Sequence, residues 1–162
     1  MKKPKLKENM SKSLVCVYWD STIKKAKELM ARKRIRHLPV LDNDGLIIGI
    51  ISDRDIVQVT NPWKASERDE ILVSDCMSWP VVKVEEDTLL ETVVEGMIKE
   101  KISAFLVTKN DEVKGIITSE DLLKVLAKIL KNKKSGLETN IVGLAYQPIV
   151  REFTRGLSSA GI

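Results

Sequence analysis

Two aspartates, Asp55 and Asp121, each end the same seven-residue phrase, which reads GIISDRD in the first case and GIITSED in the second. A hydroxyl residue, Ser52 or Thr118, precedes each aspartate by three positions. A carboxylate can accept hydrogen bonds from two neighbouring hydroxyl groups, as an acidic residue does with ribose in dinucleotide-binding folds. If a helix begins here, its free N–H groups and positive dipole end also favour phosphate. The alternative for each pair is a plain N-cap that ends a strand and starts a helix.

These phrases belong to a longer internal repeat. A shift of 67 positions aligns the first half with the second as far as Asp44, and from Gly49 onward the shift becomes 66. The one-residue difference falls near the DNDG and KNDE turns, because exposed turns tolerate changes in length. Aligned pairs include Met10 with Met77, Ile35 with Ile102, Val40 with Val107 and Gly49 with Gly115.

Each copy predicts the element order β-α-β-β-α. Ser21 and Thr88 are the predicted N-caps of the first helices. An apolar face follows each cap at helical spacing, formed by Ile23, Ala26, Leu29 and Met30 in one copy and by Leu90, Val93, Val94 and Met97 in the other. The predicted strands and closing helix are residues 14–19, 36–42, 46–51 and 54–59, and then 81–86, 103–109, 113–117 and 120–130.

The DNDG sequence at residues 42–45 resembles the start of a calcium-binding loop. An EF-hand loop needs glutamate at its twelfth position, and that position holds Asp53 here. We therefore expect a hairpin turn with Gly45 at positive φ.

Composition limits the remaining choices. The chain has 162 residues, of which 43% are apolar and 31% charged, with a net charge of +4. No apolar run approaches the roughly 20 residues of a membrane span, so we expect a cytoplasmic protein without membrane contact. Two cysteines and one histidine are too few for a tetrahedral zinc site, and reduced, buried thiols are expected. Basic runs such as residues 24–36 are either solvated helix faces or attract something anionic.

Two β-α-β-β-α copies, each ending G-h-h-[ST]-x-x-D (h apolar), resemble a stand-alone tandem pair of CBS domains, named from cystathionine β-synthase. The phrase VSDCMS at residues 73–78, with a weaker echo in LKENMS at 6–11, supports the resemblance. It implies an α/β (α+β) fold in which the repeats pack by their sheets around a pseudo-twofold axis. The predicted organisation is a first repeat at 1–60, a linker at 61–72, a second repeat at 73–130 and a C-terminal extension at 131–162.

The resemblance also implies two clefts between the repeats that bind adenosine compounds: AMP, ADP, ATP, S-adenosylmethionine or NAD. Each cleft is built crosswise, from one aspartate and the other copy's segments. Ser52, Arg54 and Asp55 would then share a ligand with Pro80, Val81, Ser103 and Ala104. Thr118 and Asp121 would share one with Ser13, Leu14, Arg36 and His37.

The two copies differ in charge beside the aspartates. Arg54 stands where the second copy has Glu120, which would repel phosphate, so the clefts are expected to differ in affinity. His37 either packs as a hydrogen-bonded core histidine or contacts phosphate. Arg36 and Arg54 are either surface residues or phosphate ligands.

The sequence offers little material for catalysis, because it lacks a Cys-His or His-His spacing, a P-loop and a dinucleotide-binding glycine motif. We therefore expect that the protein is not an enzyme. We expect a regulatory module that senses adenosine nucleotides, as in energy sensing, and modulates a separate partner of unknown identity. A homodimer is the family-level expectation. The alternatives are a protein-interaction scaffold with empty clefts, or nucleic-acid binding through the basic segments, which lacks a recognised motif.

Overall fold

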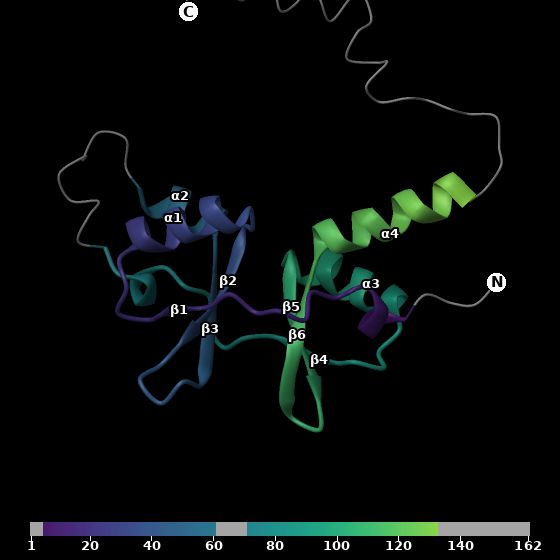
Figure 1. Ribbon diagram of the computed structural model, residues 1–162, viewed down its shortest axis with the longest axis horizontal. Helices are drawn as coiled ribbons and strands as arrows, with labels where there is room; N and C mark the ends of the chain where they lie inside the picture. Colours follow the sequence, from purple (N-terminus) through teal and green to yellow (C-terminus); the bar gives the residue numbers. More distant parts are fainter. Residues whose placement is uncertain (1–4, 61–70, 133–162) are drawn as a thin grey trace, which may run out of the picture. The chain divides into compact units, whose positions relative to one another are not determined.

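The computed structural model describes residues 5–60 and 71–132 (Figure 1). Residues up to Leu126 form one compact unit, and a second unit begins at Ala127 and contains the end of the last helix. The predicted linker and the C-terminal extension lie almost entirely outside the described residues. Within the described residues, no helix is both long and apolar enough to cross a lipid bilayer.

The two repeats have the predicted order of elements, and a short 3-10 helix stands before the first strand of each repeat. The first repeat consists of η1 (Leu6–Glu8), β1 (Val17–Tyr18), α1 (Ile23–Lys33), β2 (His37–Leu41), β3 (Ile47–Ser52) and α2 (Asp53–Val59). The second consists of η3 (Val73–Asp75), β4 (Lys83–Glu85), α3 (Leu90–Glu100), β5 (Ala104–Lys109), β6 (Glu112–Thr118) and α4 (Ser119–Asn132).

Each repeat forms a three-stranded mixed sheet. In the order β1-β2-β3, β1 is parallel to β2 and β2 is antiparallel to β3; the sheet β4-β5-β6 repeats this pattern. The paired part of the first strand is much shorter than predicted in both copies. Leu14 and Val81 precede it and lie in the segments that lead into the strands.

The strands alternate between two cores. In β2, Leu38 and Val40 point towards α1 and α2, and together with Ile51 they form the first helix-facing core. The second repeat has an equivalent core around Phe105 and Val107. The opposite faces of the two sheets meet in a third cluster, which contains Leu106 and Ile116 of one repeat and Ile50 of the other, so the repeats pack by their sheets as predicted.

The segment that precedes each repeat crosses to the other repeat. Ser11 exchanges two backbone hydrogen bonds of 2.9 Å with Ile116, and Ser78 exchanges two of 2.8 and 3.0 Å with Ile50. The 3-10 helices follow the same rule, because Leu6 is buried in the second repeat's core and Val73 in the first's. Interlocked segments therefore hold the two repeats together.

The glycines of the repeated phrase lie beneath these crossings. A Cβ built on Gly115 would lie 2.5 Å from the Ser11 carbonyl oxygen, and one on Gly49 would lie 2.5 Å from Met77 Sδ. Both distances are too short for real carbon atoms. The absence of a side chain lets the crossing backbone pair with the strand.

Three local predictions were wrong. The N-cap of α1 is Thr22, whose Oγ1 accepts from Lys25 N–H at 3.3 Å, while the predicted cap Ser21 is buried one residue earlier. Helix α3 follows Leu89 and has no side-chain cap, so Thr88 does not cap it. Val94 lies on the exposed side of α3.

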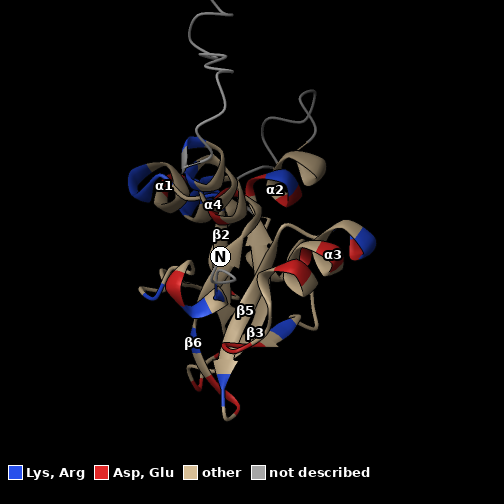
Figure 2. Cartoon of the chain, turned by 90° about the vertical axis from the view of Figure 1, so that its right-hand side faces the viewer, with Lys and Arg blue, Asp and Glu red and all other residues tan. Residues whose placement is uncertain are grey.

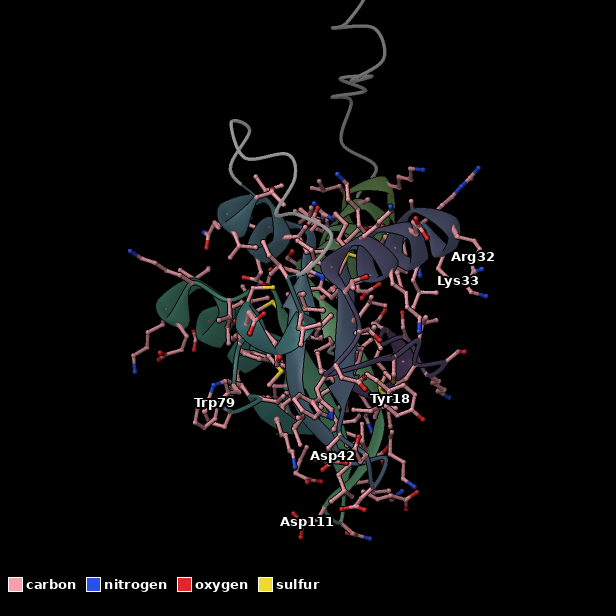
Figure 3. All side chains as sticks on the ribbon, turned by 90° about the vertical axis from the view of Figure 1, so that its left-hand side faces the viewer. Tyr18, Arg32, Lys33, Asp42, Trp79 and Asp111 are labelled. Carbon is pink, nitrogen blue, oxygen red and sulfur yellow. The ribbon has the colours of Figure 1, made fainter. Side chains whose placement is uncertain are left out.

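The DNDG turn is a hairpin turn, as expected, with Gly45 at φ +79°. Asp42 Oδ1 accepts from the N–H groups of Asp44 and Leu46, so this carboxylate closes the turn. Figure 3 shows Asp42 and Asp111 at the turns of the two hairpins. No group of side chains in residues 5–60 and 71–132 is placed to hold a metal ion.

Candidate functional site

Ser52 and Asp55 form a reciprocal cap where β3 runs into α2. Ser52 Oγ accepts from the Asp55 N–H at 3.2 Å. Asp55 Oδ2 in turn accepts from both the N–H and the hydroxyl of Ser52, each at 2.7 Å. This arrangement is a capping box, which satisfies backbone donors that a helix start leaves unpaired.

Thr118 and Asp121 repeat this geometry where β6 runs into α4. Asp121 Oδ2 accepts from the Thr118 N–H at 3.0 Å and from its hydroxyl at 2.7 Å. The Asp121 N–H donates to Thr118 Oγ1 at 3.4 Å. The two aspartates therefore hold equivalent positions and orientations.

The second carboxylate oxygen of each aspartate is differently placed. Among the described residues, Asp55 Oδ1 has no hydrogen-bond donor, and Asp121 Oδ1 has only a long contact of 3.5 Å with Lys124 Nζ. One oxygen thus serves the cap and the other remains available, so the N-cap and ligand interpretations of these aspartates do not exclude each other.

The Asp55 cleft, as we name the hollow beside α2, has a volume of about 310 Å³. Its lining brings together every residue that the resemblance assigned to it from both repeats: Ser52, Arg54, Asp55, Pro80, Val81, Ser103 and Ala104. His37, assigned to the other cleft, also lines this one. Sequence reasoning missed Ile50, Gln58, Ser78, Val82, Lys101 and Ile102.

The Asp121 cleft is smaller, about 140 Å³, and lies between α4 and the start of β2. Its lining contains all the residues assigned to it, namely Ser13, Leu14, Arg36, His37, Thr118 and Asp121. The sequence did not point to Ser11, Val15, Arg34, Ile35, Pro39, Ile116 or Lys124 as cleft residues.

Arg34 and Lys101 are the most informative of the missed residues. They are equivalent under the shift of 67, and each ends a helix in the left-handed region, at φ 54° and 55°. Each lines one cleft and brings a cation to it. Their aligned positions were the sequence signal, but a basic residue at a helix end is also expected from the helix dipole alone.

The negative charge of Glu120 is offset by nearby cations, so the Asp121 cleft is not acidic. Its carboxylate lies 3.0 Å from Lys124 Nζ and 4.0 Å from the Arg36 guanidinium. Three cationic and two anionic residues line this cleft, and two cationic and one anionic residue line the Asp55 cleft. Each cleft therefore has one cation in excess, so the expected difference in affinity has no basis in formal charge.

The basic helix α1 presents most of its cations to solvent. Figure 2 shows lysines and arginines gathered on α1, and in Figure 3 Arg32 and Lys33 project outwards from its end. Only the residues after the helix, Arg34 and Arg36, reach a cleft. The run is therefore mainly a solvated helix face, and attraction of an anion by Arg34 and Arg36 stays a prediction.

His37 connects the two clefts. Its Nε2 lies 2.8 Å from Ser103 Oγ, and its ring lines both hollows. Burial lowers the pKa of His37 below its usual range, and the nearby Asp53 carboxylate opposes this shift without cancelling it. His37 is therefore a partly buried, hydrogen-bonded histidine that is also exposed to both cleft interiors.

The thiols take no part in the clefts. Cys16 and Cys76 are free and partly buried. Burial, followed by the charges of Asp55 and Asp75, raises the pKa of Cys76 to about 11, so this thiol stays protonated near neutral pH.

The family model described as "CBS domain" matches the chain twice, at residues 6–61 and 73–128. The chain belongs to the CBS domain family. A CBS domain-containing protein of Dictyostelium discoideum is 32% identical over 135 residues, which cover 78% of this chain and 93% of that protein.

Several enzymes match this chain over a small part of their own length. Homoserine O-acetyltransferase of Methanosarcina acetivorans is 33% identical over 74% of this chain but only 21% of its own length. Inosine-5'-monophosphate dehydrogenase of Methanocaldococcus jannaschii is 33% identical over 23% of its length. The chain thus spans about a quarter or less of these curated relatives.

Solved structures share the fold. The CBS-domain protein ATU1752 of Agrobacterium tumefaciens has a TM-score of 0.70 at 24% identity, covering 75% of this chain and 92% of its own. The CBS domain pair of protein MJ0100, in complex with 5'-methylthioadenosine and S-adenosyl-L-methionine, has a TM-score of 0.67 at 27% identity. That match covers 79% of this chain and 99% of the MJ0100 pair.

Proposed function

We propose that this CBS pair is a regulatory module, not an enzyme, that binds an adenosine compound in each cleft. The observation that carries the proposal is that the two carboxylate oxygens of Asp55, and likewise those of Asp121, have different surroundings. Each fixes itself through Oδ2, and its Oδ1 is left to accept hydrogen bonds from the 2'- and 3'-hydroxyls of a ribose. The adenosine ligands of the related MJ0100 pair support the same ligand class.

The rest of each cleft suits the other parts of such a ligand. Apolar side chains, Val81 in the Asp55 cleft and Leu14 in the Asp121 cleft, offer a surface for the purine. The cations Arg54 and Lys101, or Arg34 and Arg36, offer charge-assisted hydrogen bonds to phosphate. AMP, ADP, ATP, S-adenosylmethionine and NAD all contain the adenosine core, so the clefts define a class of ligand.

Regulation would follow from the position of the clefts between the repeats. A ligand that touches both repeats binds best to one arrangement of them and shifts the population towards it. We propose that a separate partner protein reads that arrangement.

The test is calorimetry with AMP and with 2'-deoxy-AMP, on the wild type and on Asp55→Asn and Asp121→Asn. The amide oxygen of asparagine can keep the cap while its NH₂ group replaces the diol acceptor. Hydrogen bonds to a charged group contribute about 1.5–3 kcal/mol, so each substitution should weaken its cleft by roughly 10- to 150-fold. The 2'-deoxy ligand should lose affinity for the wild type by a similar factor.

Unchanged melting temperatures of the ligand-free variants are the control for folding. Absence of heat with all five adenosine compounds at about 1 mM would reject the proposal. At this concentration, even a site with a binding free energy of only about −4 kcal/mol would be half filled. Empty clefts would leave the scaffold function, in which the fold serves protein contacts alone.

We also propose that the chain forms a homodimer. Leu123, Leu126 and Leu130 are exposed at helical spacing on α4, and an apolar stripe of this kind is commonly covered by a partner. Sedimentation of Leu123→Glu should show a lower mass than the wild type; a wild type that is monomeric at all concentrations would contradict the dimer.

A further inference from the structure

One hydrogen bond joins the walls of the two clefts. His37, the first residue of β2, lines both, and its Nε2 lies 2.8 Å from the hydroxyl of Ser103. Ser103 precedes β5 in the other repeat and lines the Asp55 cleft but not the Asp121 cleft. A ligand in the Asp121 cleft can therefore reach only His37 of this pair, while a ligand in the Asp55 cleft can reach Ser103.

This link has no counterpart by symmetry. Under the shift of 67, His37 aligns with Ala104 and Ser103 aligns with Arg36. Alanine has no polar side-chain atom, so the equivalent hydrogen bond cannot form. This side-chain link is one hydrogen bond, and one substitution can remove it.

The His37–Ser103 pair has only one proton left with which to donate a hydrogen bond to a ligand. A neutral imidazole has one N–H donor and one acceptor nitrogen, and serine has one O–H. If Nε2 donates to Ser103, then Nδ1 is an acceptor and the serine O–H is free. If Ser103 donates to Nε2, then Nδ1–H is free and the serine has no remaining proton. Both arrangements fit the distance of 2.8 Å.

We propose that the ligands of the two clefts compete for the one proton that the His37–Ser103 pair can donate. This inference rests on the proposed function. The proposal places Nδ1 on the side of the ring that faces the Asp121 cleft. A phosphate oxygen that takes the Ser103 O–H in the Asp55 cleft then leaves a lone pair on Nδ1, which repels a phosphate oxygen in the Asp121 cleft. Coupling is reciprocal, so occupancy of the Asp121 cleft weakens the Asp55 cleft by the same factor. The lowered pKa of His37 supports this, since a charged ring would donate from both nitrogens.

The coupling is measured by calorimetry with AMP. Asp55→Asn and Asp121→Asn each leave one functional cleft and give the two intrinsic affinities. In the wild type, we compare the product of the two stepwise association constants with the product of the two intrinsic association constants. The first product should be about 3- to 10-fold smaller, as the loss of one hydrogen bond predicts. Adenosine, which lacks phosphate, should fill both clefts without coupling.

Ser103→Ala is the decisive variant, combined in turn with each asparagine substitution. It removes the hydroxyl, so the two clefts should bind AMP independently. Ser78→Ala is the matched control, because Ser78 lines the same cleft without bonding to His37; it should keep the coupling whatever its effect on affinity.

The outcomes separate this inference from the proposed function. Independent or positively coupled AMP sites in the wild type, or coupling that survives Ser103→Ala, would overturn the inference and leave the binding function intact. AMP binding in only one cleft would overturn the inference and would limit the proposed function to that cleft. No binding of AMP would overturn the inference, and no binding of any of the five adenosine compounds would remove the proposed function as well.

Discussion

Asp55 and Asp121 each use one carboxylate oxygen in a helix cap, which leaves the other oxygen for the proposed ligand. The sequence predicted that these aspartates and the hydroxyl residues three positions earlier stand at helix starts, because the phrase is duplicated and its spacing fits a helix cap. It could not predict which oxygen does what, since the division depends on the side-chain torsion inside the capping box. The same limit applies to His37, whose bond to Ser103 joins residues with no sequence signal in common.

His37 also makes stability depend on pH. Its pKa is lowered in the folded state and lies near 6.5 in the unfolded chain, so below this value the unfolded state binds more protons. The free energy of unfolding should therefore be intact above about pH 6.5 and fall as pH drops from 6.5 to the folded pKa. The slope cannot exceed one proton, about 1.4 kcal/mol per pH unit.

Urea unfolding between pH 7.5 and about 5 tests this expectation, with His37→Gln as the control. His37 is the only histidine of the chain, so the difference between the two proteins isolates its titration from that of the carboxylates. Parallel profiles, or a histidine contribution that grows on acidification, would contradict a lowered pKa.

At the scale of elements, the helices and the β2–β3 and β5–β6 hairpins followed from periodicity and turn residues. The first strand of each repeat and the N-caps Ser21 and Thr88 did not. Only a short part of each first strand pairs, because the crossing segments before it bond to the other repeat's sheet. Hydrophobic patterns do not encode which copy a segment pairs with, so only the family resemblance pointed to a crosswise arrangement.

Gly115→Ala tests the close approach at one crossing. The new Cβ would lie 2.5 Å from the backbone oxygen of Ser11, and backbone can move only with its hydrogen bonds. We expect a loss of about 1–3 kcal/mol in the free energy of unfolding, as for other overpacked sites. Gly49→Ala should cost less, because its nearest atom, Met77 Sδ, belongs to a flexible side chain.

Gly96→Ala is the matched control, since its Cβ would lie 3.4 Å from the Phe105 ring, an ordinary contact, within helix α3. Alanine favours helix over glycine by up to about 1 kcal/mol, so this variant should be as stable as the wild type or more so. The interpretation fails if Gly115→Ala is as stable as Gly96→Ala in urea.

At the scale of the whole chain, the two repeats are continuous in sequence but exchange parts in space. Leu6 comes before the first strand of the first repeat, yet it is fully buried in the core of the second. Val73 does the same in the opposite direction. A cut between the repeats would therefore remove residues from both cores, and we expect the described residues up to Leu126 to unfold as one cooperative unit.

Leu6→Ala is the sharpest test of this interlocking. Removing a fully buried leucine should lower the free energy of unfolding by about 2–5 kcal/mol, although the residue lies near the chain terminus. Leu46→Ala, at a site that is 63% exposed, controls for the substitution and should change stability by less than about 0.5 kcal/mol. Far-UV circular dichroism, which follows both repeats, and the near-UV signal of Phe105 and the tryptophans should give one coincident urea transition in every variant. A loss below about 1 kcal/mol for Leu6→Ala, or transitions that separate so that only one repeat unfolds, would mean that each repeat keeps its own core and the crossing segments are peripheral.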